Sequence, residues 1–301
     1  MKLTRTLIRS LTAAAIAACS FAAGAESLGP TLDKIAASGT VYLGHREASV
    51  PFSYLVPGRD EPEGFSIEIC GHVVKAIEEK LGKKLTVQPV VVSANSRLMM
   101  VKIGMADLEC GVTTHTVARE QQAAFSMTFF VSEVKAMVRA DSKAKSLKDM
   151  ADQRIVTTVG TTADRLVKQA AMTRSVAVRS LVGRNHARSM EMLEKGEADV
   201  YVADDAVLLG ERAQSDTPEK YQILDEGYSV EPYSLILPRG DVQFKQLVDE
   251  VLIGLMKSGQ MEKIYNAWFM SPIPPKNHTL NFPMSSLNKS AYANPNDRPI
   301  N

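Results

Sequence analysis

The chain has 301 residues, 45% of them hydrophobic, and a formal net charge of +1. Because it has neither a basic patch nor an aromatic-rich strip, the sequence does not indicate a nucleic-acid-binding protein. Beyond the N-terminal segment, no stretch is apolar and long enough to span a bilayer. The length suits one large domain or two medium-sized lobes.

The N-terminal segment has the three-part pattern of a secretory signal. A basic start is followed by a short apolar run, 11–18, and by small residues at 23–25. We therefore predict a signal peptide, residues 1–25, cleaved after Ala25, and a periplasmic protein. The alternative is a bacterial lipoprotein in which Cys19 is lipidated. Both interpretations place the protein outside the cytoplasm.

Strand-like and helix-like segments alternate along the mature chain. In the first part, the predicted elements are a helix 31–38, a strand 41–43, a helix 66–81 capped by Ser66, a strand 85–92, a helix 97–103 and a strand 108–113. The later ones are a strand 134–139, a short helix capped by Ser146, a strand 154–159, a helix opened by 160–162, a strand 175–182, a helix 187–194, a strand 199–203, a helix 206–213, a strand 233–237 and helices 244–256 and 261–268. This alternation predicts an α/β fold with parallel sheets covered by helices. The tail from Ser271 is rich in Pro, Asn and Ser, and we expect it to wrap the surface.

Polar side chains follow most of the predicted strands. In open α/β sheets, ligands gather at the carboxyl ends of strands, so these side chains are candidates for a binding site. The candidates include Arg46, Arg97, Thr114, Arg119, Thr162, His186 and Asp204. Three arginines at three separate strand ends are the clearest chemical signal in the sequence.

The three arginines favour a ligand with two carboxylates. The planar fork of an arginine matches one carboxylate, so a second carboxylate needs a second cluster. Against Asp204 alone, the arginines leave two positive charges, and an acidic amino acid of charge −1 reduces this excess. A neutral amino acid would leave an arginine unpaired, which costs several kcal/mol when buried. This charge arithmetic predicts selection of an acidic amino acid.

Each candidate also has a structural interpretation. A single arginine is usually a solvated surface residue, and His186 alone is typical of a structural histidine. Thr162 and Asp204 could cap helices, although the start of a helix after a glycine also favours an anion. Phe52 is typical of a core residue.

Two cysteines, Cys70 and Cys110, remain after cleavage. In an oxidising compartment they are candidates for a disulfide, and the alternative is two buried free thiols. There is no Cys-x-x-Cys, and the five histidines lack metal-ligand spacing, so we predict neither a metal nor a cofactor.

Several motifs taken together resemble one known family, the glutamate/aspartate-binding proteins of polar amino-acid ABC importers (solute-binding protein family 3). The resemblance extends from Thr31 to the C-terminus. The motifs are residues 44–47, 50–54, 109–111, 113–114 with 119, 160–162, 204–206, 210–213, 272–277 and 294–297.

The resemblance implies two α/β lobes joined by two crossing strands, with a ligand cleft between them. Lobe one would comprise residues 26–131 and 230–301, and lobe two residues 132–229. The implied function is binding without catalysis. A monomer would capture L-glutamate or L-aspartate and deliver it to an ABC transporter permease in the inner membrane.

The resemblance also implies how the common part of an amino acid is held. Arg119, with Thr114 and Thr162, would bind the α-carboxylate. Asp204 would take the α-ammonium group.

The side chain of the ligand would meet a second group of residues. Arg46, Arg97 and His186 would surround its carboxylate, and Phe52 would pack on the ligand.

Two positions depart from the family pattern. Close relatives carry serine where this chain has Ala94 and Val112. Each change removes a hydroxyl group whose hydrogen bond has a typical net value of about 1 kcal/mol. The acidic class of ligand is retained, and the choice between glutamate and aspartate is left open.

Two other functions fit the same fold. Cyclohexadienyl dehydratases share the scaffold, and Glu47 is the nearest candidate for the poised acid that such an enzyme needs. We find no Ser/His/Asp or Cys/His spacing that indicates a nucleophile. A periplasmic sensor subunit would bind the same ligand and contact a receptor, and the sequence does not distinguish it from a transport protein.

Overall fold

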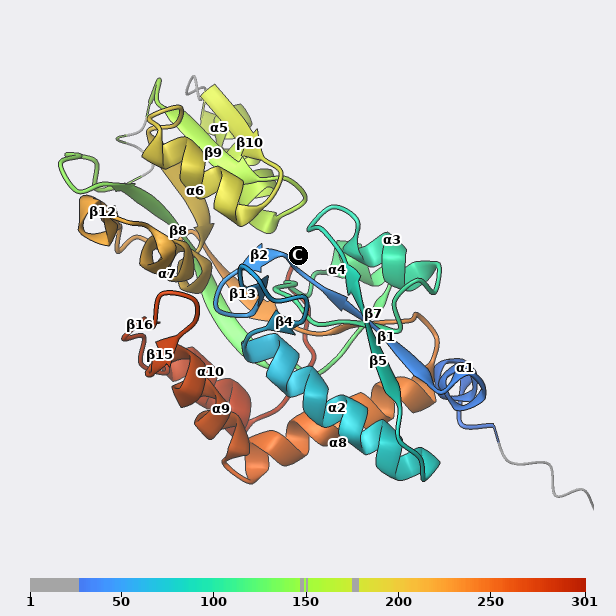
Figure 1. Cartoon of the computed structure of the whole chain (residues 1–301). Helices are drawn as coiled ribbons and strands as arrows, with labels where there is room; N and C mark the ends of the chain where they lie inside the picture. Colours follow the sequence, from blue (N-terminus) through green and yellow to red (C-terminus); the bar gives the residue numbers. More distant parts are fainter. Residues whose placement is uncertain (1–26, 147–148, 150, 175–178) are drawn as a thin grey trace, which may run out of the picture.

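The computed structural model describes residues 27–146, 149, 151–174 and 179–301. Its two larger sheets lie in different halves of the molecule (Figure 1). The predicted signal peptide and the Cys19 alternative lie outside the described residues. So do part of the predicted helix after Ser146 and the start of the predicted strand 175–182.

The first sheet is built mainly from the N-terminal part of the chain. Its strand order is β5 (Thr86–Val91), β1 (Thr40–His45), β6 (Leu108–Glu109), β14 (Ile236–Leu237) and β7 (Ala124–Phe125). β1 runs parallel to β5 and β6, whereas β14 is antiparallel to its neighbours. The helices of this half are α1 (Pro30–Ser38), α2 (Phe65–Leu81), α3 (Arg97–Lys102), α4 (Val117–Glu120), α8 (Val242–Lys257) and α9 (Gln260–Phe269). As the predicted ranges 31–38 and 66–81 indicate, α1 and α2 end at Ser38 and Leu81, and the glycines that follow, Gly39 and Gly82, adopt the left-handed conformation that glycine allows.

The second sheet contains the middle of the chain. Its strand order is β10 (Arg179–Gly183), β9 (Arg154–Thr158), β11 (Val200–Asp204), β8 (Phe130–Arg139) and β12 (Tyr221–Ile223), with β13 (Ser229–Tyr233) also paired to β8. β9, β10 and β11 are parallel, but β8 is antiparallel to all its partners. The helices here are α5 (Thr162–Arg174), α6 (His186–Glu194) and α7 (Asp205–Gln214), followed by a short 3-10 helix, η2 (Pro218–Lys220). The predicted α/β class is confirmed, and the parallel prediction holds only for β5, β1 and β6 in the first sheet and for β10, β9 and β11 in the second.

Two antiparallel strands, β8 and β13, connect the halves (Figure 1). At one end of the pair, Phe130 and Tyr233 are buried in the large core beneath the first sheet. Four residues further along β8, Val134 belongs to a core of the second sheet. The chain therefore crosses from one core to the other through this strand pair.

Aromatic rings dominate the first core. Phe52, Phe65, Phe130, Tyr233 and Phe269 contact one another edge-on or stacked, and all are fully buried. Such residues bury large apolar areas and dominate core energetics. The second sheet has two smaller cores, composed mainly of aliphatic residues and methionines.

The structure differs from the prediction at four places. The predicted strand 233–237 is two strands, β13 and β14, because the chain leaves one sheet for the other between Tyr233 and Ile236. Ser66 lies inside α2 and donates to the carbonyl oxygen of Gly111 in place of capping the helix. The tail adds β15 (Pro272–Ile273), β16 (His278–Thr279) and an unpredicted helix, α10 (Ser286–Ala293). A small hairpin sheet of β2 (Ala48–Ser49), β3 (Ser53–Leu55) and β4 (Pro62–Glu63) was also not predicted.

Cys70 and Cys110 form a disulfide, which resolves the alternative left open by the sequence. It links α2 to the end of β6 across 40 residues of chain. Of the helices in the described part of the chain, none is long and apolar enough to cross a membrane.

Candidate functional site

The predicted site residues lie where strands of both sheets end. Arg46 follows β1, Arg97 opens α3 after β5, and Asp204 ends β11. Thr162 and His186 open α5 and α6, directly after β9 and β10. Arg97 lies close enough to Arg46, Arg119 and Asp204 for their charges to influence one another. The structure therefore brings the polar strand ends of the two sheets to one place.

One part of the site, here called the arginine end, consists of Arg46, Arg97, Glu109 and His186. All four side chains are buried, with at most 3% of their surface exposed. Arg97 donates from Nη1 to the carbonyl oxygen of Ala94 at 2.6 Å. Within the described residues, three atoms of the arginine end have no hydrogen-bond partner: Arg46 Nη1, Arg97 Nε and Glu109 Oε1. These two buried N–H donors belong to two positively charged guanidinium groups, so together they form a site that favours a carboxylate.

The two arginines keep their charge although they are close together. Burial, followed by repulsion from Arg97, lowers the pKa of Arg46 to about 10, and burial lowers that of Arg97. Because an arginine guanidinium is not deprotonated in proteins near neutral pH, both side chains keep their positive charge. Burial raises the pKa of Glu109, while the two arginines lower it. Even with Glu109 ionised, the two arginines leave one uncompensated positive charge at this end.

His186 adds a donor without adding charge. Burial, with repulsion from Arg46 and Arg97, lowers its pKa well below the usual value, so the ring is neutral at pH 7. Its Nδ1 lies 2.8 Å from the hydroxyl of Tyr201 and 3.1 Å from that of Thr158. Because Tyr201 keeps its proton, Nδ1 can accept from it, and Nε2 then carries the ring proton.

Arg119 connects elements of the two sheets. Its Nη1 donates to the carbonyl oxygen of Thr114 at 2.7 Å, and its Nη2 to that of Gly160, before α5, at 3.2 Å. Gly160 is left-handed, and a Cβ atom there would lie 2.8 Å from the carbonyl oxygen of Ala94. The two halves thus meet closely here, and glycine is needed for this approach.

The other part of the site, the acidic end, consists of Thr162, Asp204, Glu231 and Tyr233. The hydroxyl of Tyr233 donates to Asp204, and that of Thr162 donates to Glu231 Oε2 at 2.8 Å. Burial, followed by repulsion from Glu231, raises the pKa of Asp204 to about 8. At neutral pH, Asp204 is therefore mostly protonated in the unliganded protein.

Phe52 is placed differently from the other predicted site residues. It is fully buried in the aromatic core, with its ring centroid 4.9 Å from that of Phe130 and 5.4 Å from that of Tyr233. The structure connects it to the site through Tyr233. The predicted packing of Phe52 on the ligand stays a prediction.

Two buried acids of the site, Glu109 and Glu231, were not predicted as site residues from the sequence. The excess of two positive charges, predicted from the arginines and Asp204 alone, is therefore wrong, because these acids offset it. Glu109 ends β6 within a recognised motif, so its position after a strand could have revealed it. Glu231 lies inside β13, where no strand was predicted, and its partner Thr162 is 69 residues away.

The two departures from the family pattern are buried. Ala94 provides a backbone carbonyl for Arg97, and Val112 packs in the first core. Glu47, the acid considered for an enzyme, is exposed to solvent, unlike the buried residues of the arginine end. In the described part of the chain, no cluster of three or more His, Cys, Asp or Glu side chains could hold a metal ion.

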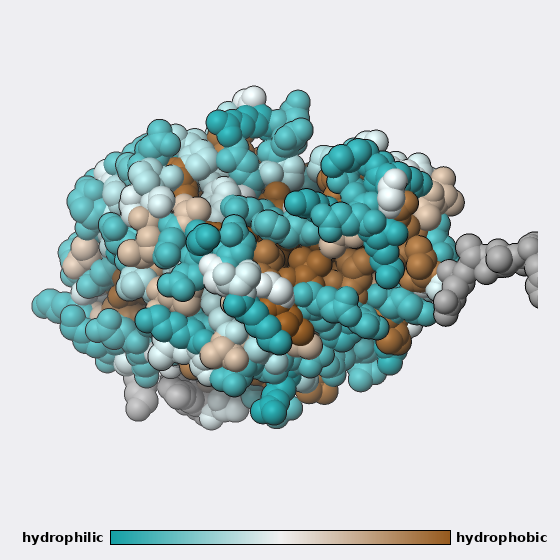
Figure 2. Space-filling view, turned by 90° about the horizontal axis from the view of Figure 1, so that it is seen from below, coloured by the Kyte–Doolittle hydropathy of each residue, from teal (hydrophilic) through white to brown (hydrophobic). Residues whose placement is uncertain are grey.

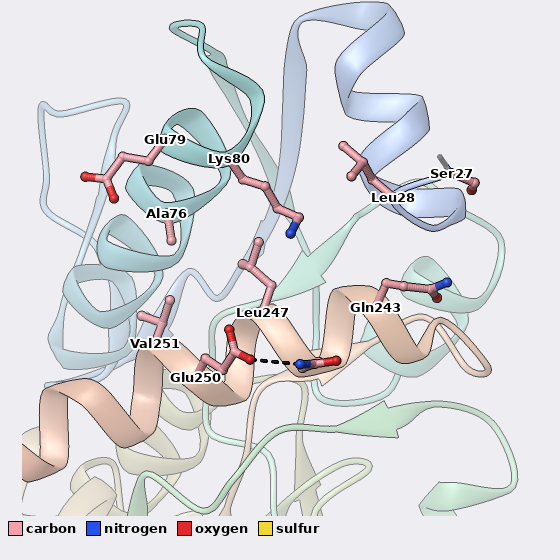
Figure 3. Close-up of a pocket in the computed structure, with 10 residues that line it drawn as sticks. Ser27, Leu28, Ala76, Glu79, Lys80, Gln243, Leu247, Glu250 and Val251 are labelled. Atoms are coloured by element: carbon pink, nitrogen blue, oxygen red, sulfur yellow. Dashed lines mark hydrogen bonds between the residues drawn. The ribbon is translucent and has the colours of Figure 1, made fainter. Parts of the chain in front are cut away.

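A separate groove of about 720 Å³ lies between α1, α2 and α8. Figure 2 views this side of the molecule and shows an apolar patch surrounded by hydrophilic residues. Ala76, Leu247 and Val251 contribute apolar surface, and Lys80 reaches across from α2 (Figure 3). Glu250 accepts a hydrogen bond from Gln246 on the same helix at 2.9 Å. None of the predicted site residues lines this groove, so we do not place the ligand there.

Comparison with solved structures identifies the fold. A mutant of ArgBP from T. maritima superimposes with a TM-score of 0.70, covering 79% of this chain and 99% of that one at 22% sequence identity. At that identity, the likeness shows the two-lobed fold alone.

Comparison of sequences identifies the family. The model of bacterial extracellular solute-binding proteins, family 3, matches residues 41–271. The "Glutamate/aspartate import solute-binding protein" of Escherichia coli strain K12 is 36% identical over 278 residues, covering 92% of each chain. The "L-glutamate/L-aspartate-binding protein" of Pseudomonas aeruginosa is 36% identical over 275 residues, covering 91% of each. The chain belongs to family 3 of the bacterial extracellular solute-binding proteins. These relatives are binding proteins and not enzymes, so the comparison does not favour the dehydratase alternative.

Proposed function

We propose that this protein captures an acidic amino acid, L-glutamate or L-aspartate, in the periplasm and delivers it to the permease of an ABC importer. The observation that carries the proposal is a pair of buried donors, on Arg46 and Arg97, that have no hydrogen-bond partner among the described residues and lie beside a neutral His186. One positive charge remains there, and one side-chain carboxylate would balance it. The names of the two 36% identical relatives support the same ligands.

The ligand would bind with its side-chain carboxylate at the arginine end. Its α-carboxylate would lie on Arg119, near Thr114 and the first N–H groups of α5. Because the hydroxyl of Thr162 already donates to Glu231, Thr162 would contribute its backbone N–H, which has no partner within the helix. The α-ammonium would approach Asp204.

Binding would couple to closure of two lobes, residues 26–131 with 230–301 and residues 132–229. The bond from Arg119 to Gly160 and the close approach of Gly160 to Ala94 join elements of both sheets. A ligand that contacts both halves stabilises the closed form and shifts the population towards it. We further propose that the protein is a monomer and that its signal peptide is cleaved after Ala25 during export.

Titration calorimetry on the ligand-free protein tests the ligand class. We expect glutamate and aspartate to bind at least about 30-fold more tightly than glutamine, because an amide leaves a buried charge unpaired, at a cost of about 2 kcal/mol or more. Arginine, with a cationic side chain, should not bind detectably. Equal affinity for glutamine or arginine would refute the proposal.

A further inference from the structure

Glu231 is a buried carboxylate for which the proposed function has no role. Only 1% of its surface is exposed. Its Oε2 accepts from Thr162, and its Oε1 accepts from the hydroxyl of Ser229. Its charge acts on both Arg119 and Asp204. It therefore lies near both the group proposed to hold the α-carboxylate and the group proposed to hold the α-ammonium.

Strand register places Glu231 and Asp204 on the same face of the second sheet. Glu231 on β13 is opposite Ser132 of β8, and Asp204 on β11 is opposite Val134 of β8. Residues two apart on a strand share a face, and directly opposed residues of antiparallel strands do so too. The hydroxyl of Tyr233, two residues beyond Glu231, bonds to Asp204 and confirms that the side chains of β13 reach β11.

We propose that Asp204 and Glu231 together form the ammonium site of the bound amino acid, and that in the empty protein the two carboxylates hold one proton, which the ammonium replaces. This inference rests on the proposed function and deepens it. The exchange is balanced, since one cation takes the place of another: the ligand ammonium binds and a proton leaves to solvent. The pair together with the cation it holds therefore carries the same net charge before and after binding.

The surroundings of the pair favour this exchange. The groups that face it are Ser132 from β8, Asp205 from α7, Thr162 from α5, Ser229 and Tyr233 from β13, Arg119 from α4 and Arg97 from α3. Repulsion between the acids, added to burial, keeps the pKa of Asp204 near 8. An ammonium beside Asp204 would lower that pKa. Affinity should thus rise from pH 6 to about 8 and level off above it, once Asp204 is already ionised.

The same arrangement selects against dicarboxylates without an amino group. Glutarate matches glutamate in length and in its two carboxylates, but it brings no cation to replace the proton. The pair would keep its proton, and the hydroxyl-bonded carboxylates would gain no new partner. We therefore expect the paired acids to determine amine specificity.

Calorimetry of the wild-type protein at pH 7, in buffers of different ionisation enthalpy, counts the protons released. We expect glutamate to release about one proton and glutarate none. Glutamate binding without proton release would overturn the inference and leave the proposed function intact. Failure of the wild type to bind any acidic amino acid would overturn both.

Glu231→Gln separates recognition from folding. We expect roughly tenfold weaker glutamate binding, unchanged or tighter glutarate binding, and much less proton release. The matched control is Glu133→Gln, at a half-buried position on β8 opposite Val230, which should change neither affinity. If Glu231→Gln weakened both ligands equally, Glu231 would have only a structural role and the inference would fail. If this variant does not fold, the wild-type proton count still decides.

Discussion

The two ends of the site are built in opposite ways. At the arginine end, buried N–H groups of Arg46 and Arg97 lack partners among the described residues. At the acidic end, hydroxyl groups already satisfy both carboxylates, from Tyr233 to Asp204 and from Thr162 to Glu231. The difference teaches that the arginine end lacks its partner until a carboxylate arrives, whereas the acidic end can exist alone by holding a proton. Selectivity for acidic ligands should therefore depend on the first, and sensitivity to pH on the second.

The largest loss of ligand affinity is expected from substitution of Arg119, whose charge interacts with groups of both ends. Arg119→Ala should weaken glutamate, aspartate and any residual glutamine binding by a similar factor, about 100-fold or more, because all three share the α-carboxylate. Arg119→Lys keeps the charge but loses the fork, so it should rescue only part of the affinity. Titration of each variant measures this. A loss confined to the acidic ligands would place Arg119 at the side-chain carboxylate instead.

Arg97→Ala should weaken only the binding of the side-chain carboxylate at the arginine end. We expect a large loss for glutamate and a smaller one for glutamine, a difference of about 2 kcal/mol, because only glutamate brings a second carboxylate. Arg59→Ala is the control, since Arg59 is exposed and its ion pair with Glu63 lies at the surface. Equal losses for both ligands would undo the assignment of Arg97.

Asp204→Asn should show how much folding stability the protein loses when the buried carboxyl group of Asp204 ionises. A folded-state pKa raised from 3.8 to about 8 means that the native protein loses stability as pH rises between these values. The variant avoids this loss, so its melting temperature without ligand should exceed that of the wild type increasingly from pH 5 to pH 8. It should also lose most glutamate binding. A variant less stable than wild type at pH 8 would contradict this account.

Glu211→Gln is the matched control outside the site. Burial, with repulsion from Glu194, raises the pKa of Glu211 from 4.5 to about 8. The substitution should stabilise the protein by about 1–3 kcal/mol at pH 8, with little effect near pH 4, and leave glutamate affinity unchanged. Thermal melts and titration measure the two properties separately.

The smallest change in ligand affinity is expected at Ala94, where this chain differs from the family pattern. Ala94→Ser restores a hydroxyl beside Arg97, and one hydrogen bond of about 1 kcal/mol would tighten acidic ligands about fivefold. Weaker binding would indicate that the close approach of Gly160 leaves no room for the hydroxyl. The ratio of glutamate to aspartate affinity in this variant would show which ligand gains.

The sequence revealed the arginine end better than the acidic end, for a physical reason. Arg46 and Arg97 follow recognisable strands, and the alternation of strands and helices places such residues at one edge. Glu231 acts through Thr162 and Asp204, which come from other segments, and only strand register brings them together. The pattern around Phe52 is the same for a core residue and for a ligand contact, so its enclosure by aromatic rings required the structure.

A crystal structure of the protein with bound glutamate tests the central claim most directly. The account predicts the side-chain carboxylate within hydrogen-bonding distance of Arg46 and Arg97, the α-carboxylate on Arg119, and the ammonium between Asp204 and Glu231. A glutamate bound in the reverse orientation, with its ammonium away from Asp204, or a ligand in the groove between α2 and α8, would contradict it.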